Sequence, residues 1–351
     1  MSEPLRIALL LAKIGLLFFV FLTALAYTVL MERKVLGFIQ LRYGPNRVGR
    51  WGLLQPLADG LKLFLKEDII VSGADRAIYV LAPMLAFVAA VLPFAVVPVA
   101  PRVAPETISL LGWKIELGGV LSQGVISDLN VGILYVFAVG SLSVYAVVLG
   151  GWSSNNKYSL LGGLRSAAQL ISYELSVGIS IVGVLILTGS LSLVEIVEAQ
   201  AQVPFAAVQP LGFAVYLVAA FAECCRTPFD LTECENELVA GYQTEYSSMK
   251  FALFQLAEYG HVVTVSALAV TLFLGGWQGP WPVPPIVWFM LKTAAMVFVF
   301  IWVRGTLPRF RFDQLMGLGW KVLLPLALLN VLITAFAVTI APSGPMFGGL
   351  P

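Results

Sequence analysis

Four acidic residues that follow one another closely, Asp230, Glu233, Glu235 and Glu237, form the group of side chains best suited to proton chemistry. Residues three and seven positions apart share one face of a helix, so Asp230, Glu233 and Glu237 would lie together. Carboxylates held close together repel one another, and one of them then takes up a proton more readily. The segment around them is rich in Phe, Leu, Val and Tyr, which favours burial. We therefore expect a proton-handling role, with a solvated acidic loop as the alternative.

A helix is expected to begin at the start of this acidic segment. Thr227 has the side chain of an N-cap residue, Pro228 fits the first helical turn, and Asp230 follows three residues after the cap. Such a helix would carry the acidic residues, with Glu235 pointing away from the others.

Further ionisable residues lie within or at the edge of long apolar runs. An ionisable side chain inside a bilayer is costly and therefore indicates function. We predict a functional role for Glu174 and Glu258, whereas Glu223 is equally well explained as a carboxylate at the membrane surface. His261 shares a helix face with Glu258 but is more typical of a packing residue than of a proton carrier. For Lys292 a position reaching the membrane surface and a buried role are both open.

The composition indicates that these residues are held by a membrane protein. Of the 351 residues, 59% are apolar and only 12% are charged, whereas soluble domains carry about 25% charged residues. The formal net charge of +1 gives no basic excess for nucleic-acid binding. One histidine and three cysteines exclude a metal-rich protein and argue against a disulfide framework.

The apolar runs predict an all-α polytopic membrane protein with eight transmembrane helices in one membrane domain, residues 1–351. A transmembrane helix needs about 20 mostly apolar residues, and these runs are too long and too uniformly apolar for barrel strands. The first span also resembles a cleavable signal peptide that ends at Ala26, but we keep it as a span. The expected spans are approximately 7–31, 77–100, 131–151, 166–187, 208–225, 251–274, 285–304 and 321–341.

The distribution of Lys and Arg predicts the orientation of the chain. Loops that follow the odd-numbered spans carry sixteen Lys and Arg residues, and the other loops carry three. Because basic residues favour the cytoplasmic side, both termini are expected on the outer, periplasmic side. The two most polar loops, 32–76 and 226–250, then lie inside. On the outer side, Leu191–Ala199 could form an amphipathic helix at the membrane surface.

The first inner loop contains a turn followed by a candidate surface helix. Gly44–Gly49 is a turn-forming segment. Leu53–Leu65 is rich in apolar residues, and Asp59, Lys62 and Lys66 are spaced at three and four. This pattern favours a helix that lies along the membrane surface. Such a helix would suit the mouth of a site for an amphipathic, lipid-like molecule.

Two long motifs carry a resemblance to a known family. Residues 52–67, GLLQPLADGLKLFLKE, resemble the first signature of the complex I subunit 1 family, and residues 228–241, PFDLTECENELVAG, resemble the second. Cys234 stands where Gly or Ala is common. Supporting matches lie at residues 31–34, 164–174 and 308–315. The family comprises the H subunit of bacterial NADH–quinone oxidoreductase and subunit 1 of the mitochondrial enzyme, and the resemblance extends from the first helix to the last.

The resemblance implies a membrane subunit of respiratory complex I, the proton-translocating NADH:quinone oxidoreductase. The family subunit forms the membrane part of the quinone chamber and the start of the proton-coupling path, with no complete active site on its own chain. The inner loops would form the quinone site and dock the hydrophilic arm.

Matching residue by residue extends this expectation to individual side chains. The quinone chamber would include Arg33, Asp59, Arg226 and Phe229. The coupling path would include Glu174, Glu223, Asp230, Glu233, Glu235, Glu237 and Glu258. A docking or structural role is expected for Arg42, Lys62, Lys66, Arg165, Arg309 and Arg311. The alternative for the acids is that they pair with basic residues such as Arg165 and Arg226 to hold loops together.

No cofactor and no metal are expected on this chain, because it lacks the cysteine spacing of an iron–sulfur protein and a G-x-G-x-x-G unit. The substrate would be a quinone, with ubiquinone expected, and FMN and iron–sulfur clusters would lie on partner subunits. The expected partners are the peripheral-arm subunits B and D, the membrane subunits A, J and K, and the lipid bilayer. The sequence shows no transit peptide, which favours the bacterial inner membrane, or the mitochondrial inner membrane if the protein is organelle-encoded.

Two other classes of protein are weighed against this one. The first is the homologous membrane subunit of an ion-pumping hydrogenase or formate hydrogenlyase, but the Gly44–Gly49 turn leading into residues 52–67 favours the quinone-reducing branch. The second is a free-standing secondary transporter. The sequence shows no internal repeat, and its large inner loops suit docking, so both features argue against a transporter.

Overall fold

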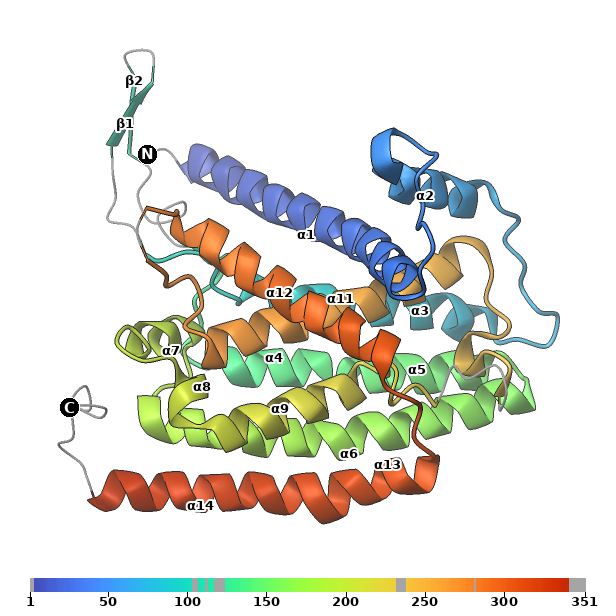
Figure 1. The fold of residues 1–351 in the computed structure, drawn as a ribbon. Coiled ribbons are helices and arrows are strands. Elements are labelled where there is room, and N and C mark those ends of the chain that lie inside the picture. The colour runs from blue at the N-terminus through green and yellow to red at the C-terminus, as the bar shows by residue number, and fades with distance from the viewer. Residues whose placement is uncertain are drawn as a thin grey trace.

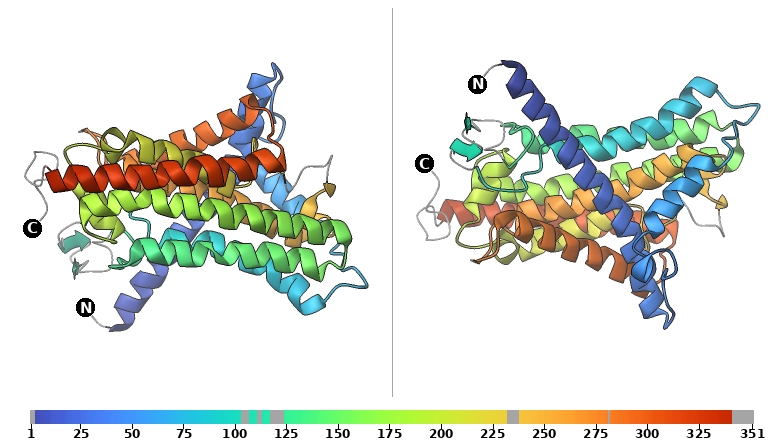
Figure 2. Two further views of the ribbon diagram at one scale, coloured as in Figure 1. Left: turned by 90° about the horizontal axis from the view of Figure 1, so that it is seen from below. Right: turned by 90° about the horizontal axis from the view of Figure 1, so that it is seen from above.

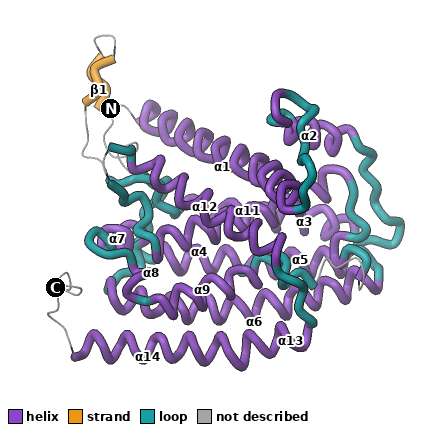
Figure 3. Tube along the Cα trace, viewed as in Figure 1, coloured by secondary structure: helices purple, strands orange, loops and turns teal. Residues whose placement is uncertain are grey.

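The protein folds into a bundle of long helices (Figure 1). The structure is a computed structural model, and it describes residues 3–102, 107–110, 113–116, 124–231, 238–280 and 282–340. Within these residues, seven helical segments are long and apolar enough to cross a membrane. Loops gather at the two ends of the bundle (Figure 3). The first turn of α1 and the last turn of α14 lie at the same end (Figure 1). The seven segments are Ile7–Ile39, Arg76–Ala95, Gly132–Ser153, Lys157–Thr188, Ser248–Phe273, Pro285–Thr306 and Phe312–Ile340.

The helices that form these segments have the following bounds. α1 is Glu3–Ile39, α3 is Arg76–Val91 and continues as a 3-10 turn, Leu92–Ala95, and α4 and α5 are Gly132–Gly140 and Leu142–Ser153. α6 is Lys157–Thr188, α11 is Ser248–Phe273 and α12 is Pro285–Thr306. The last segment joins α13, Phe312–Leu318, through a π-helical turn, Gly319–Leu323, to α14, Leu324–Ile340.

The predicted fifth span, 208–225, corresponds to a shorter helix. α9 is Pro210–Glu223, 14 residues, and follows the single turn α8, Phe205–Val208. At 1.5 Å per residue α9 is about 21 Å long, which is less than the roughly 30 Å of a hydrocarbon core. It packs along α6 inside the bundle (Figure 1). The eight-span count therefore remains a prediction.

The all-α prediction omits a small β-hairpin. In the loop between α3 and α4, β1 (Thr107–Leu110) pairs antiparallel with β2 (Trp113–Glu116). α7, Leu193–Ala199, confirms the helix expected near residue 191, but four of its seven residues are buried. Glu195 and Glu198 are exposed, so α7 is amphipathic and packs its apolar face on the end of the bundle. Its position at the membrane surface remains a prediction.

α11 is the central helix and α1 a peripheral one. The most apolar stretch of α11 is 83% buried within the chain, whereas that of α1 is 6% buried. α1 crosses the other helices obliquely (Figure 2). A helix so apolar and so exposed within its own chain needs lipid or another subunit against it.

Small residues allow α6 to pack closely against its neighbours. A Cβ added at Gly162 would lie 2.6 Å from the Cα of Gly241, in the 3-10 turn Gly241–Gln243. Asn156 caps the start of α6 by accepting from the amide of Tyr158, and Gly189 ends it with a φ of 65°. Close approach at glycine is typical of helices packed in membranes.

The loop after α1 folds into the helix predicted in residues 53–65. α2, Gln55–Leu65, is amphipathic, and none of its residues is buried. A short 3-10 turn, Arg50–Gly52, precedes it, and the Cβ of any residue at Gly52 would lie 2.1 Å from the carbonyl oxygen of Pro45. The loop before α2 is therefore tightly folded, and it sets α2 beside the C-terminal end of α1 (Figure 1).

The helix expected to begin at Thr227 does not begin there. After α9 the chain turns at residues 224–231, and the amide of Phe229 donates to the carbonyl of Arg226 at 2.8 Å. Phe229 is buried (4% exposed). Burial of this ring outweighs the capping preference of the local sequence, because the amide that Thr227 would cap is used in the turn.

Candidate functional site

An apolar groove separates α1 from α2. Its volume is about 590 Å³. The lining is almost entirely aliphatic and aromatic, and its polar side-chain groups are the hydroxyls of Thr23 and Tyr27. The lining residues are Phe19, Leu22, Thr23, Ala26, Tyr27, Leu53, Leu54, Pro56, Leu57, Gly60, Leu61 and Phe64. A surface of this shape and chemistry fits a long apolar chain rather than a polar metabolite.

A charged pair joins the two helices that form this groove. Arg33 Nη1 on α1 lies 2.6 Å from Asp59 Oδ2 on α2, and Gln55 donates to the other oxygen of Asp59 at 3.0 Å. The Arg33 side chain is 47% exposed. Exposed pairs contribute little to stability, about 0–1 kcal/mol. The pair therefore mainly places polar groups beside an apolar groove, and it brings together two of the residues expected at the quinone chamber.

A second pair joins α1 to α12. Arg304 donates to Glu32, the residue before Arg33, and Glu32 is buried. Both charges act electrostatically on Glu258 of α11. The charges of Glu32 and Arg304, which lie near the groove, therefore influence the buried carboxyl group of Glu258. Neither Glu32 nor Arg304 stands out as a site residue in the sequence, although both are ionisable residues at the ends of predicted spans.

The most buried ion pair joins the loop after α9 to α11. Arg226 Nε lies 2.8 Å from Glu258 Oε1, and both side chains are only 9% exposed. The Arg226 guanidinium also lies 4.3 Å from the ring centre of Tyr259. Burial of two charges is tolerated here because each compensates the other. Arg226 therefore lies deep in the protein, against α11.

Phe229 and Asp230 pack toward the last helices of the chain. Asp230 Oδ2 lies 3.3 Å from Arg309, and the Asp230 side chain is 9% exposed. The ring of Phe229 stacks on Phe310, with 5.5 Å between ring centres. The carbonyl of Phe229 accepts from buried Gln169 at 2.9 Å. These contacts anchor the turn after α9 between α6 and α13, and Phe229 is absent from the lining of the α1–α2 groove.

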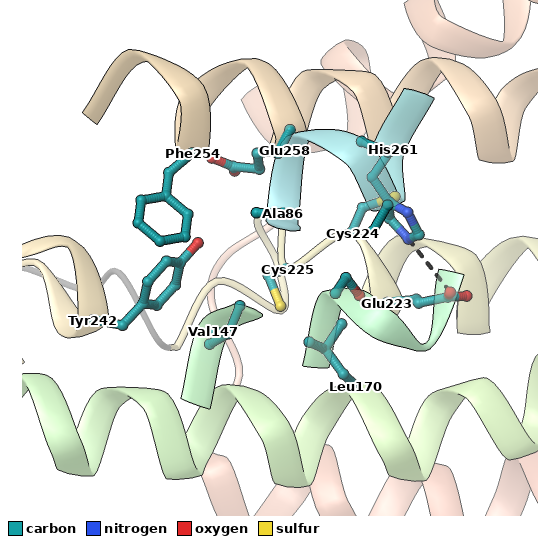
Figure 4. Close-up of a pocket in the computed structure, with 14 residues that line it drawn as sticks. Ala86, Val147, Leu170, Glu223, Cys224, Cys225, Tyr242, Phe254, Glu258 and His261 are labelled. Carbon is teal, nitrogen blue, oxygen red and sulfur yellow. Dashed lines mark ion pairs between the residues drawn. The ribbon is translucent and has the colours of Figure 1, made fainter. Parts of the chain in front are cut away.

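A small cavity, the first cavity, lies where the chain leaves α9 (Figure 4). It has a volume of about 70 Å³, and Glu223, Cys225, Glu258 and His261 contribute to its wall. Glu223 and His261 point toward each other, with 3.3 Å between Oε1 and Nε2. One water needs about 10–15 Å³ by this measure, so the first cavity has room for several.

A second cavity lies beyond this pair. Its volume is about 30 Å³, which leaves room for one or two waters. Glu174, Glu223 and His261 line it, together with Tyr216 and Thr264. Glu174 and Glu223 thus lie at the wall of the same small cavity. We refer to Asp230, Glu258, Glu223 and Glu174, in that order, as the carboxylate row.

The remaining predicted acids, Glu233, Glu235 and Glu237, lie outside the described residues.

The residues expected to dock the arm divide into two groups. Arg165 lies 5.3 Å from the ring centre of Phe312, Arg309 pairs with Asp230, Arg311 lies 3.5 Å from exposed Asp313, and Arg42 donates to Gln40. Lys62 and Lys66 on α2 are exposed. The first group contacts other residues of the chain, although Arg42, Arg309 and Arg311 are exposed as well.

Lys292 has a buried role that the sequence left open. Its ammonium group donates to the carbonyls of Leu274, Gly276 and Gln278 at 2.7, 3.2 and 2.6 Å. These carbonyls lie in the turn after α11, where Gly275 and Gly276 have positive φ. The lysine therefore caps the negative end of the α11 dipole.

Among the described residues, no three His, Cys, Asp or Glu side chains gather as a metal site.

The fold and site define a polytopic helical membrane protein that combines an apolar surface groove with buried, partly paired carboxylates. The family model of NADH dehydrogenase matches residues 12–335, and the chain belongs to this family. It is 54% identical over 332 residues to H subunit 1 of the NADH-quinone oxidoreductase of Geobacter metallireducens, covering 95% of this chain and 97% of that protein. It is 56% identical over 327 residues to H subunit 2 of the same enzyme in Geobacter sulfurreducens, covering 93% and 95%. H subunit 2 of the Syntrophobacter fumaroxidans enzyme is 53% identical over 325 residues.

Proposed function

We propose that this chain is the membrane subunit of a proton-translocating NADH:quinone oxidoreductase, respiratory complex I. Its membership of the NADH dehydrogenase family and its similarity over nearly its full length to proteins named as the H subunit of NADH-quinone oxidoreductase carry this proposal. The chain contributes to an enzyme whose active site is completed by other subunits. The names of these relatives favour this function over a hydrogenase subunit or a transporter.

The α1–α2 groove is proposed as the membrane part of the quinone chamber. An isoprenoid tail is apolar and long, as is the lining of the groove. The carbonyl groups of a quinone head need hydrogen-bond donors, and Arg33, which is held by Asp59, is a donor on one of the two helices. Arg226, which forms the buried pair with Glu258, and Phe229 would act farther inside. Ubiquinone is the expected substrate, and FMN and iron–sulfur clusters belong to partner subunits.

The quinone role is tested by Arg33→Ala, with Lys157→Ala as the matched control because Lys157 is an exposed cation at the start of α6. A hydrogen bond to a charged group contributes about 1.5–3 kcal/mol, so Arg33→Ala should lower NADH:quinone turnover about tenfold or more. NADH oxidation by ferricyanide should survive, since the flavin arm is unchanged. Equal loss of both activities would indicate failed assembly, and normal quinone turnover would contradict the proposed chamber.

The carboxylate row is proposed as the start of the proton-coupling path, with Glu233, Glu235 and Glu237 as further members. Three features support it: Glu258 and Glu223 share the first cavity, Glu223 and Glu174 share the second, and all three lie within the bundle. Charges act over longer range there than in water, so quinone reduction can change the protonation of the row.

The coupling role is tested by Glu174→Gln and Glu235→Gln, because Gln keeps the volume but cannot ionise. Assembled complex should remain, with depressed quinone turnover and proton pumping. If the acids only hold loops together, the same changes should reduce the amount of complex and leave turnover per complex near normal. Normal activity with a normal proton-to-electron ratio in both variants would refute the coupling role.

The proposed setting is a bacterial inner membrane, with eight spans in one membrane domain and both termini outside. Inner loops 32–76 and 226–250 would then face the hydrophilic arm, and exposed Lys62 and Lys66 would contact it. Subunits B and D of the arm and A, J and K of the membrane are the proposed partners.

The proposed topology can be tested with single cysteines placed in 44–49 and in 103–119, which should be labelled from opposite faces of sealed vesicles. Labelling of both from one face would refute this topology.

A further inference from the structure

The single histidine of the chain lies at the junction of the two cavities. His261 is on α11, and its Nε2 lies 3.3 Å from Glu223 Oε1 on α9. Its side chain is 20% exposed, although it lies in the interior of the bundle. This combination indicates that the ring faces cavity space as well as packed side chains.

Among the described residues, Glu223 and His261 alone line both cavities. The first cavity contains Glu258 at its wall, and the second contains Glu174. Figure 4 shows the Glu223 and His261 side chains directed at each other at the boundary of the first cavity. A proton that moves between Glu258 and Glu174 by the shortest cavity route therefore passes this pair.

We propose that His261 is a proton-transfer residue that, together with Glu223, connects the two cavities of the carboxylate row. This inference rests on the proposed coupling role of the row. In the forward step the O–H bond of protonated Glu223 breaks and an N–H bond forms at His261 Nε2, which leaves a carboxylate and an imidazolium. The imidazolium then releases one proton to water of the second cavity, from which Glu174 takes it. One proton moves, and the imidazole returns to its neutral form.

The surroundings of His261 fit this role. Glu258 of α11 lines the first cavity, Glu174 of α6 lines the second, and Glu223 of α9 lines both. Arg226 is paired to Glu258. The α3, α4 and α5 residues that line the cavities carry no acidic or basic side chain. Other ionisable groups at the walls are Cys224, Cys225, Tyr216 and Tyr242. Histidine is the side chain whose ordinary charge change falls between about pH 5 and 8, which suits repeated proton transfer.

A fixed counter-ion would explain the same contact differently. A permanently charged His261 would hold Glu223 and Glu174 as carboxylates and would transfer no proton. A packing residue would do neither. The three roles differ in what Asn and Lys do at this position, because Asn keeps polarity without a proton site and Lys keeps a positive charge.

The test uses the whole complex reconstituted in liposomes, with variants His261→Asn, His261→Gln and His261→Lys. The matched control is Ser266→Ala, a buried residue of α11 that lines neither cavity. Quinone reduction and the proton-to-electron ratio are measured between about pH 5 and 8. Ferricyanide reduction and the amount of complex report assembly, and the Gln variant serves if the Asn variant fails to assemble.

Proton transfer predicts that the Asn, Gln and Lys variants all lose coupled turnover, by about tenfold or more. It also predicts that the pH profiles of the three variants differ in shape from that of the unsubstituted complex. Wild-type turnover in His261→Lys, with loss in His261→Asn, would overturn the proposal in favour of a counter-ion. Normal turnover and pH profile in His261→Asn would overturn it in favour of packing.

The same experiment separates failure of this inference from failure of the coupling role. Glu174→Gln and Glu223→Gln are measured beside the histidine variants. If both acid variants lose pumping and His261→Asn does not, only the histidine proposal fails. If none of them changes turnover or pumping, the carboxylate row itself is not the coupling path.

Discussion

The buried pair of Arg226 and Glu258 allows a quantitative prediction. Arg226→Met keeps most of the side-chain volume but removes the cation, and Glu258 is then left buried beside a neutral residue. The charged atoms are 2.8 Å apart, and each side chain is 9% exposed. At an effective dielectric constant of about 20, this separation corresponds to roughly 6 kcal/mol of Coulomb attraction.

While both charges are present, the cost of removing them from water offsets most of that attraction. The contribution of the pair therefore becomes visible when only one of the two charges is removed. Removal of one member of a buried pair costs about 3–5 kcal/mol, because the other charge stays uncompensated. Arg304 still attracts Glu258, but Asp230 and Glu32 repel it, so the full range of about 3–5 kcal/mol is expected. Loss of the Tyr259 contact adds about 0.5–2 kcal/mol. The double variant Arg226→Met/Glu258→Gln removes both charges and should recover most of the stability.

The assay is thermal inactivation of the purified complex, with the amount of assembled complex in the membrane as a second measure. The expected order of midpoints is the unsubstituted complex first, the double variant next and Arg226→Met lowest. Lys157→Met removes an exposed cation and should leave the midpoint unchanged. A double variant as unstable as Arg226→Met, or an Arg226→Met midpoint equal to the unsubstituted one, would refute the view that charge compensation sets the stability here.

Three further predictions concern other parts of the chain. Lys292→Met leaves three carbonyls without their donor and should lower the thermal midpoint by the equivalent of about 1–3 kcal/mol; an unchanged midpoint would contradict the capping role. Gly162→Ala places a Cβ 2.6 Å from Gly241 and should reduce assembled complex, whereas Gly178→Ala on the same helix meets nothing within 4 Å and should not. Gly60→Trp extends into open space of the α1–α2 groove and should slow reduction of long-tailed quinones more than short-tailed ones; equal effects on both would argue against the groove.

Local sequence patterns predicted the helices better than they predicted which side chains contact one another. The surface helix α2 followed from the apolar-rich stretch near Asp59, because that pattern depends on the segment alone. Glu258 and His261 share a helix face as expected, yet they contact different elements, Arg226 and Glu223. Which neighbour each side chain meets depends on the rotation and depth of the adjacent helices, and sequence spacing does not contain that information.

Contacts between distant segments account for most of what the sequence did not reveal. Glu32 pairs with Arg304, which is 272 residues away, so no local spacing could indicate the pair. The helix predicted to begin at Thr227 does not begin there; residues 224–231 turn instead, with the Phe229 ring buried. Lys292 was ambiguous for a similar reason, since its three carbonyl partners become a site only after α11 ends in a glycine turn.

The shortness of α9 has a consequence for the membrane voltage. With its outer end at the edge of the hydrocarbon, its 14 residues end about 9 Å short of the other edge. In the proposed orientation Glu223 then lies inside the electric field and not at its inner boundary. Moving one charge across the whole field costs about 2.3 kcal/mol per 100 mV, so bringing a proton from the inner side to Glu223 costs roughly 0.7 kcal/mol per 100 mV. Filling of the carboxylate row from the inner side would therefore become harder as the inside-negative voltage rises.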